Sequence, residues 1–259
     1  GTGLLLAVAS RQVDRLLLTL GGTATVDGGC GILQALGCRV LTDYGVPLDD
    51  PVTGGRLTSL TRVEAVTGLP PMDLAADVMV PLLGPDGAAR RFGPQKGADD
   101  HDVDLLEAGL MRLADLVDPE GRFRRVPGGG AAGGTAFTLH ALLGAEIHSG
   151  AERLLDLLDF ETHLQDVDLL LVGEGRLDSQ SIHGKAPFVA ATRARDRTTR
   201  IIGICGQRGE GWEALRRDHG GPLDDIISLT DAHPLDRARS EPADCLRSVV
   251  TGILSGTEG

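Results

Sequence analysis

The chain has 259 residues and a formal net charge of −12, because 37 aspartates and glutamates outnumber 25 lysines and arginines. An acidic surface repels phosphate backbones and anionic lipid, so this balance argues against nucleic acids and membranes as partners. No apolar run reaches the roughly 18–20 residues of a membrane span. The opening segment also lacks the basic start of a signal peptide, so we expect a cytoplasmic location.

The cysteine and glycine content narrows the kind of site to expect. The four cysteines form no CxxC pair and no zinc-ligand spacing, which predicts ordinary buried thiols. With 37 glycines but only one Trp, one Tyr and five Phe, glycine loops that approach a ligand closely are favoured over aromatic stacking platforms.

Hydrophobic periodicity predicts alternating strands and helices along the whole chain. In the first half we expect strands at residues 15–20, 38–41 and 74–80, and helices at 28–36, 103–117, 132–143 and 151–158. In the second half we expect strands at 168–172, 201–205 and 226–229, and helices near 187–195, 212–217 and 243–254.

This order of elements predicts an α/β fold with two domains. Strand, loop and helix repeated three times in the second half indicate a parallel sheet with right-handed crossovers. Residues 146–259 are therefore predicted to form a doubly wound, Rossmann-like domain, and residues 1–145 a second, less regular α/β domain. Ligands of such sheets bind beyond the carboxyl ends of the strands, which directs attention to residues 21–29, 173–185 and 206–211.

The first of these segments, GGTATVDGGCG at residues 21–31, combines backbone amides with threonine hydroxyls at the start of an expected helix. Such a combination is typical of an anion site. The alternative is a tight turn without a ligand, capped by Asp27 at the helix N-terminus. The segment matches neither a Walker A loop nor a dinucleotide fingerprint.

The segment GEGRLDSQSIHGK, residues 173–185, is dense in ionisable groups and directly follows an apolar strand. Two roles fit Asp178: general base on a hydroxyl, or Mg²⁺ ligand together with Glu174. Lys185 or Arg176 would pair with a phosphate or a carboxylate. The alternative is a solvated loop at a helix entry.

Two further loops have weaker signals. FGPQKGA at residues 92–98 places Lys96 on a stiff turn, where it would clamp a phosphate or simply be solvated. VPGGGAAGG at 126–134 fits a close approach of backbones, an anion nest or a hinge.

Taken together, these stretches resemble bacterial class I glycerate kinases. The resemblance is carried by LGGTATVDGGCGILQALG, FGPQKGA, PGGGAAGG, LLLVGEGRLDSQSIHGKAP and IIGICG, and it is collinear over essentially the whole chain. It implies two α/β domains with the site in the cleft between them. It also implies phosphorylation of D-glycerate by ATP with Mg²⁺, with 2-phosphoglycerate as the favoured product.

The resemblance also implies which residues form the site, and phosphoryl-transfer chemistry suggests their roles. We expect Asp178 to be the base, Lys96 and Lys185 to bind phosphate, Arg176 to hold the glycerate carboxylate, and Glu174 to lie on the metal side. The remaining expected substrate- and phosphate-binding residues are Gly21, Gly22, Thr23, Thr25, Asp27, Gln95, Ser179 and His183.

Two departures from the family pattern keep alternatives open. Segments that the family carries near its N-terminus have no counterpart here, so the chain is N-terminally truncated relative to the family, and unpaired strand edges favour homo-oligomers. The family's Asp-Val-Asp-Asn-Pro-Leu is DVMVPL at residues 77–82, with Met79 and Val80 replacing polar residues. A kinase of another small 2-hydroxy acid and a non-catalytic remnant therefore remain alternatives.

Overall fold

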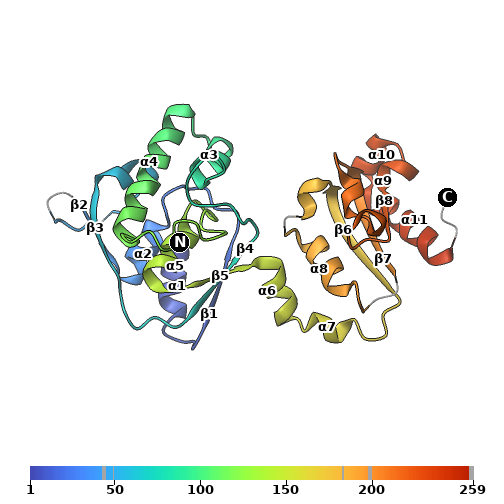
Figure 1. Ribbon diagram of the computed structural model, residues 1–259, viewed down its shortest axis with the longest axis horizontal. Coiled ribbons are helices and arrows are strands. Elements are labelled where there is room, and N and C mark those ends of the chain that lie inside the picture. The colour runs from blue at the N-terminus through green and yellow to red at the C-terminus, as the bar shows by residue number, and fades with distance from the viewer. Residues whose placement is uncertain (43–44, 49, 183, 198–199, 257–259) are drawn as a thin grey trace. The chain divides into compact units, whose positions relative to one another are not determined.

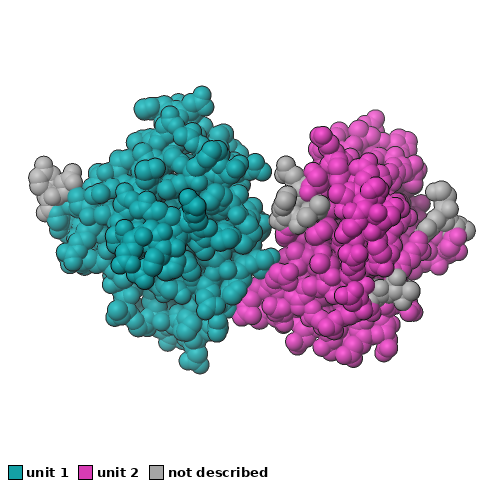
Figure 2. Space-filling model, in the orientation of Figure 1, with its two compact units in different colours: residues 1–150 teal, residues 151–259 magenta. Residues whose placement is uncertain are grey.

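The computed structural model describes residues 1–42, 45–48, 50–182, 184–197 and 200–256. The chain forms two compact units, Gly1–Gly150 and Ala151–Gly259, each with its own parallel sheet and its own core (Figures 1 and 2). The mixed α/β fold predicted from the sequence is confirmed. In the described part of the chain, none of the helices combines the length and the apolar character of a membrane span.

The first unit is built on three parallel strands in the order β1-β4-β5, which are Leu16–Leu20, Met72–Ala76 and Glu146–Ser149. β5 belongs to this sheet because it pairs with β4, so the unit extends past residue 145, where the sequence analysis placed the domain boundary. Helices α1 (Thr2–Ala9), α2 (Cys30–Leu36) and α5 (Thr135–Leu143) contribute Leu6, Leu33 and Leu139 to the core of the sheet.

A second apolar cluster of this unit lies around α4 (Asp100–Val117). α4 begins earlier than the periodicity predicted because Asp99 and Asp102 form a reciprocal capping box at its start. The other elements here are β2 (Arg39–Thr42), η1 (Gly54–Ser59), β3 (Leu60–Glu64), α3 (Ala88–Phe92) and η2 (Pro94–Lys96). β2 and β3 pair in antiparallel fashion.

The second unit has a three-stranded parallel sheet in the order β6-β7-β8: Leu169–Leu177, Arg200–Arg208 and Asp225–Ser228. One face packs against α8 (Ala186–Ala194) and η4 (Trp212–Leu215), and the other against α9 (Leu229–Ala232) and α11 (Pro242–Ser255). Helices on both faces are the doubly wound arrangement expected from the sequence. The remaining elements are α6 (Gly150–Leu157), α7 (Phe160–His163), η3 (Ser179–Ile182), η5 (Arg217–His219) and α10 (Leu235–Ser240).

The structure corrects two predicted elements of the second unit. β6 and β7 extend beyond their apolar runs, because pairing continues at Glu174 with Cys205 and at Arg176 with Gln207. Glu174 and Arg176 are therefore strand residues rather than loop residues. The helix expected at 212–217 is instead the two 3₁₀ turns η4 and η5, since Arg216 between them is extended.

All four cysteines are buried and free, as the sequence predicted. Burial raises the pKa of the Cys30 thiol to about 12, and it also raises the pKa of Cys38 and Cys205. These thiols therefore act as small apolar side chains in the cores.

Arg193 joins three elements of the second unit. Its guanidinium on α8 lies 3.1 Å from the Glu152 carboxylate and 2.7 Å from that of Asp156, both on α6. Its Nε also donates to Glu161 of α7 at 2.6 Å. This hydrogen bond is the main reason that the pKa of Glu161 is lowered.

Replacing Arg193 by Met should therefore reduce the stability of the second unit in a pH-dependent way. Because the folded-state pKa of Glu161 is lowered, its contribution is complete above the ordinary value of 4.5 and is lost as pH falls below it. We expect the variant to melt about 2–4 °C lower than wild type at neutral pH, with a smaller gap under acid conditions. Circular dichroism melts at both pH values measure this, with the exposed Arg195→Met as the matched control. An equal gap at both pH values would contradict an ionic role.

Candidate active site

The loop that follows β1 turns by means of glycines. Gly22, Gly28 and Gly29 have φ angles of 64°, 61° and 69°, which favour glycine. Asp27 lies between them, and its Oδ1 accepts a hydrogen bond from the N–H of Gly29 at 2.9 Å. The alternative in which Asp27 is the N-cap of the next helix does not hold, because α2 begins at Cys30 with Gly29 as its N-cap and the Asp27 carboxylate closes a turn within the loop.

A second glycine-rich segment, residues 128–134, packs directly against this loop. The N–H of Gly28 donates to the carbonyl of Gly133 at 3.0 Å. A Cβ at Gly133 would lie 2.2 Å from the carbonyl oxygen of Thr25, and a Cβ at Gly130 would lie 2.2 Å from that of Pro81. Side chains at these positions would force the backbones apart, so the glycines make the close approach possible.

Lys96 connects a third segment to the same loop. It lies in η2, and its Nζ donates to the carbonyl oxygen of Thr25 at 2.7 Å. Partial burial lowers the pKa of Lys96, and the negative charge of Asp27 opposes this shift. Burial therefore disfavours the charged form of Lys96, whereas the carbonyl of Thr25 and the negative charge of Asp27 stabilise it.

Lysine is rare in this sequence, so the positions of its two lysines are informative about the site. The sequence contains 23 arginines but only two lysines, Lys96 and Lys185, and both fall in the segments singled out as candidate sites. Lysine differs from arginine in offering a compact point charge whose pKa shifts on burial. Lys96 shows this behaviour, since partial burial lowers its pKa.

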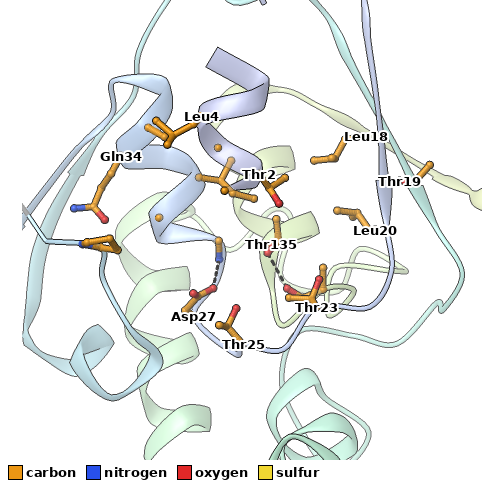
Figure 3. A pocket seen from close by; sticks show the side chains of 18 of the residues that line it. Thr2, Leu4, Leu18, Thr19, Leu20, Thr23, Thr25, Asp27, Gln34 and Thr135 are labelled. Carbon is orange, nitrogen blue, oxygen red and sulfur yellow. Dashed lines mark hydrogen bonds between the residues drawn. The ribbon is translucent and has the colours of Figure 1, made fainter. Parts of the chain in front are cut away.

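Two cavities lie along the loop. The smaller, here called the lysine pocket, has a volume of about 160 Å³ and is lined by Gly21, Gly22, Thr23, Asp77, Gln95 and Lys96, among others. The larger, here called the threonine pocket, has a volume of about 620 Å³, and Thr2, Thr19, Thr23, Thr25, Asp27 and Thr135 are among the residues that line it (Figure 3). Leu20, Gly21, Thr23 and Ala132 line both pockets. The structure thus brings together all the site residues that the sequence analysis chose in the first unit.

Asp77 was not among the predicted site residues. It follows the last residue of β4 and lines the lysine pocket together with Val78. Its position at the carboxyl end of a parallel strand was the available signal. Of the two residues that depart from the family pattern, Met79 is 45% exposed, whereas the carbonyl of Val80 accepts the N–H of Gly130 at 3.0 Å.

The second unit carries its own polar cluster at the end of β6. The Nε of Arg176 lies 3.5 Å from Oδ2 of Asp178. Ser181 is buried, and its hydroxyl lies 3.2 Å from the backbone N–H of Asp178. The half-buried Glu174 lies two residues before Arg176 on the same strand.

The segment that follows β7 supports this cluster. A Cβ at Gly209 would lie 2.5 Å from Nε of Arg176, and a Cβ at Gly211 would lie 3.0 Å from Cβ of Ser179. The N–H of Ser179 donates to the carbonyl of Glu210 at 3.0 Å. The ends of β6 and β7 therefore form one surface.

Two predicted residues of this unit are placed differently from the rest. Lys185 is half-buried and occupies the N-cap position of α8, with extended backbone angles. His183 lies outside the described residues.

The carboxylates of Glu174 and Asp178 are the donors in this cluster that suit Mg²⁺. Hard oxygen ligands from one or two carboxylates, completed by phosphates and water, are what this ion usually takes in proteins. Among the described residues, the one group of three close ligand types is Asp73, Glu146 and His148. Arg15 pairs with the buried Asp73 at 2.9 Å there, so we interpret that group as an ion-pair network at the amino end of β4 and β5.

Comparison with known proteins places the chain in a family. The profile of the glycerate kinase family matches residues 1–257. A glycerate kinase of Bacillus subtilis (strain 168) is 37% identical over 98% of this chain and 68% of its own length. A glycerate 2-kinase of Escherichia coli (strain K12) is 38% identical over 92% of this chain and 64% of its own length.

A solved structure agrees with these sequences. A crystal structure assigned as glycerate kinase 2 from Salmonella typhimurium LT2 aligns with a TM-score of 0.72 and 35% identity, over 99% of this chain and 69% of that one. The chain belongs to the glycerate kinase family. It spans 68% and 64% of the lengths of the two relatives.

The electrostatic contact between Asp27 and Lys96 predicts a measurable shift. Because the negative charge of Asp27 raises the pKa of Lys96, Asp27→Asn should lower that pKa further, while the amide oxygen can still accept the Gly29 N–H. Reductive methylation with ¹³C-formaldehyde labels both lysines, and an NMR pH titration then follows Lys96. The Lys185 signal is the internal control and should be the same in both proteins. An unchanged or higher Lys96 pKa would show that the two charges do not interact.

Proposed function

We propose that this chain catalyses transfer of the γ-phosphoryl group of ATP to D-glycerate, giving 2-phosphoglycerate and ADP. The observation that carries the proposal is Lys96, a half-buried ammonium group held against a glycine loop at the carboxyl end of a parallel sheet. A cation and open backbone amides at such a place suit a phosphoryl group. Membership of the glycerate kinase family gives the reaction class.

The proposed chemistry needs few covalent steps from the protein. Asp178 accepts the proton of the glycerate hydroxyl, and the hydroxyl oxygen forms a bond to the γ-phosphorus as the bond to the ADP oxygen breaks. Lys96 and Lys185 balance the charge on the phosphates, and Arg176 binds the glycerate carboxylate as a planar donor pair. Glu174 would hold Mg²⁺, which supplies positive charge near the transferred group.

Several observations support these assignments. Asp178 and Arg176 lie within 3.5 Å of each other, so a base and a carboxylate-binding cation occupy one surface of the second unit. Gly21, Gly22 and Thr23 line the same pocket as Lys96 and Gln95 in the first unit. We propose that residues of both units act in one reaction, with Thr25, Asp27, Ser179 and His183 as further binding residues.

A coupled assay of ADP release with D-glycerate and MgATP tests the proposal. We expect turnover that depends on glycerate, and direct conversion of the product by enolase, which accepts 2-phosphoglycerate. Binding of nucleotide without any turnover of glycerate would favour a non-catalytic remnant. Faster turnover of another 2-hydroxy acid would favour the alternative that the exposed Met79 suggests.

Asp178→Asn should lower kcat by about 10²–10⁴-fold, because it removes the proton acceptor and keeps the size of the side chain. The KM for ATP should change little. Steady-state kinetics of the variant and of Asp196→Asn, the same substitution at an exposed residue outside the candidate site, give the comparison. A kcat equal to wild type would exclude Asp178 as the base.

A further inference from the structure

The two pockets of the first unit differ in size in a way that matters for a nucleotide. A ligand as large as a nucleoside usually occupies a cavity of roughly 300–1,000 Å³. The threonine pocket, at about 620 Å³, falls in this range, whereas the lysine pocket, at about 160 Å³, has room only for a small group.

The residues that line the two pockets also differ in polarity and charge. The threonine pocket is lined by Leu4, Leu18, Leu20 and Ile32 and by threonine hydroxyls, and Asp27 has the only charged side chain among the described residues that line it (Figure 3). Apolar walls with a few hydroxyls suit a base and a sugar. The lysine pocket contains the ammonium group of Lys96 and the side-chain amide of Gln95, which suit phosphate oxygens.

The loop between the pockets is open to a ligand on both sides. Gly21 lines both cavities, and a Cβ at Gly21 or at Gly22 would meet no atom within 4 Å. A phosphate chain can therefore pass close to this backbone. We propose that the first unit binds the nucleotide of the proposed kinase reaction, with the nucleoside in the threonine pocket and the terminal phosphates in the lysine pocket. This inference rests on the proposed function for the choice of ligand.

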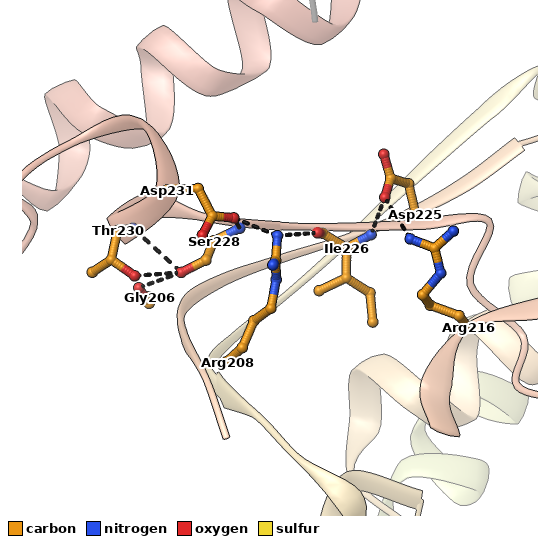
Figure 4. A network of polar contacts seen from close by, with 8 residues as sticks. All are labelled: Gly206, Arg208, Arg216, Asp225, Ile226, Ser228, Thr230 and Asp231. Atoms are coloured by element: carbon orange, nitrogen blue, oxygen red, sulfur yellow. Dashed lines mark hydrogen bonds and ion pairs between the residues drawn. The ribbon is translucent and has the colours of Figure 1, made fainter. Parts of the chain in front are cut away.

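A cavity of about 730 Å³ beside β8 in the second unit is the rival site. Its lining includes the carboxylates of Asp225 and Asp231, just as the two pockets of the first unit include Asp27 and Asp77. Its arginine is already engaged: Arg208 donates to the carbonyl of Ile226 at 3.0 Å and pairs with Asp231 (Figure 4). The guanidinium of Arg208 also lies over the ring of Trp212. The cation therefore favours the first unit for an anionic ligand, because Lys96 donates to the Thr25 carbonyl and an ammonium group has three donors.

Gly31 offers a way to fill the threonine pocket selectively. It lines this pocket near the start of α2, and the nearest atom to an added Cβ is Cβ of Pro51 at 3.9 Å, an ordinary contact. Its φ is not in the left-handed range, so Gly31→Leu is compatible with the backbone. Lys96→Met removes the charge of the lysine pocket and keeps most of the stem. Ser248→Trp, on the exposed face of α11, obstructs the rival cavity and is the control.

Calorimetric titration of the full chain with three probes tests the proposal: a non-hydrolysable ATP analogue, adenosine and inorganic tripolyphosphate. We expect Gly31→Leu to weaken the analogue and adenosine at least tenfold and to leave tripolyphosphate unchanged. Lys96→Met should weaken the analogue and tripolyphosphate and leave adenosine unchanged, and Ser248→Trp should match wild type.

Unchanged binding of adenosine and the analogue to Gly31→Leu, or loss of binding only in Ser248→Trp, would overturn the proposal. No binding of the analogue to the wild-type chain would overturn it as well. If the expected pattern is found but glycerate is not phosphorylated, the nucleotide site is supported and the proposed function fails. Circular dichroism melts of each variant establish that it is folded.

Discussion

The candidate site in the first unit depends on one contact, the hydrogen bond from Nζ of Lys96 to the carbonyl of Thr25. It joins segments that are 71 residues apart in the sequence and places a positive charge beside a glycine loop. Burial opposes that charge and lowers the pKa of Lys96, while Asp27 opposes the shift. A cation held in this way retains donors for an incoming phosphate oxygen, since an ammonium group has three.

The fold makes this contact possible through close backbone packing. β1 and β4 are neighbours in a parallel sheet, so the segments after Leu20 and Ala76 meet at one edge. The glycines of residues 128–134 then let a third segment approach the loop, with Gly133 against Thr25 and Gly130 against Pro81. In the second unit, Gly209 makes room for side chains instead, since an added Cβ would lie 2.5 Å from Nε of Arg176 and 2.6 Å from Cβ of Asp178. Glycines therefore allow close packing at both candidate sites, against backbone in the first unit and against side chains in the second.

The sequence predicted the class of fold and most elements, because apolar runs and helical spacing are strong local signals. It missed β5, whose residues Glu146 and His148 are polar; the His148 ring lies 3.4 Å from the Glu146 carboxylate and 3.5 Å from that of Asp73 on the neighbouring strand. It ended β6 too early, since Glu174 and Arg176 are charged although their backbones stay paired. The motifs identified Lys96 and Asp27 separately, but only the tertiary structure brings Lys96 to the loop that contains Asp27.

The proposed contact of Lys96 with the phosphates of a nucleotide can be tested directly. With only two lysines in the chain, acetylation by acetic anhydride can be followed at each by peptide mass spectrometry. We expect a non-hydrolysable ATP analogue with Mg²⁺ to slow acetylation of Lys96 severalfold and adenosine alone to leave it unchanged. Equal rates at Lys96 with and without a saturating concentration of the analogue would contradict it.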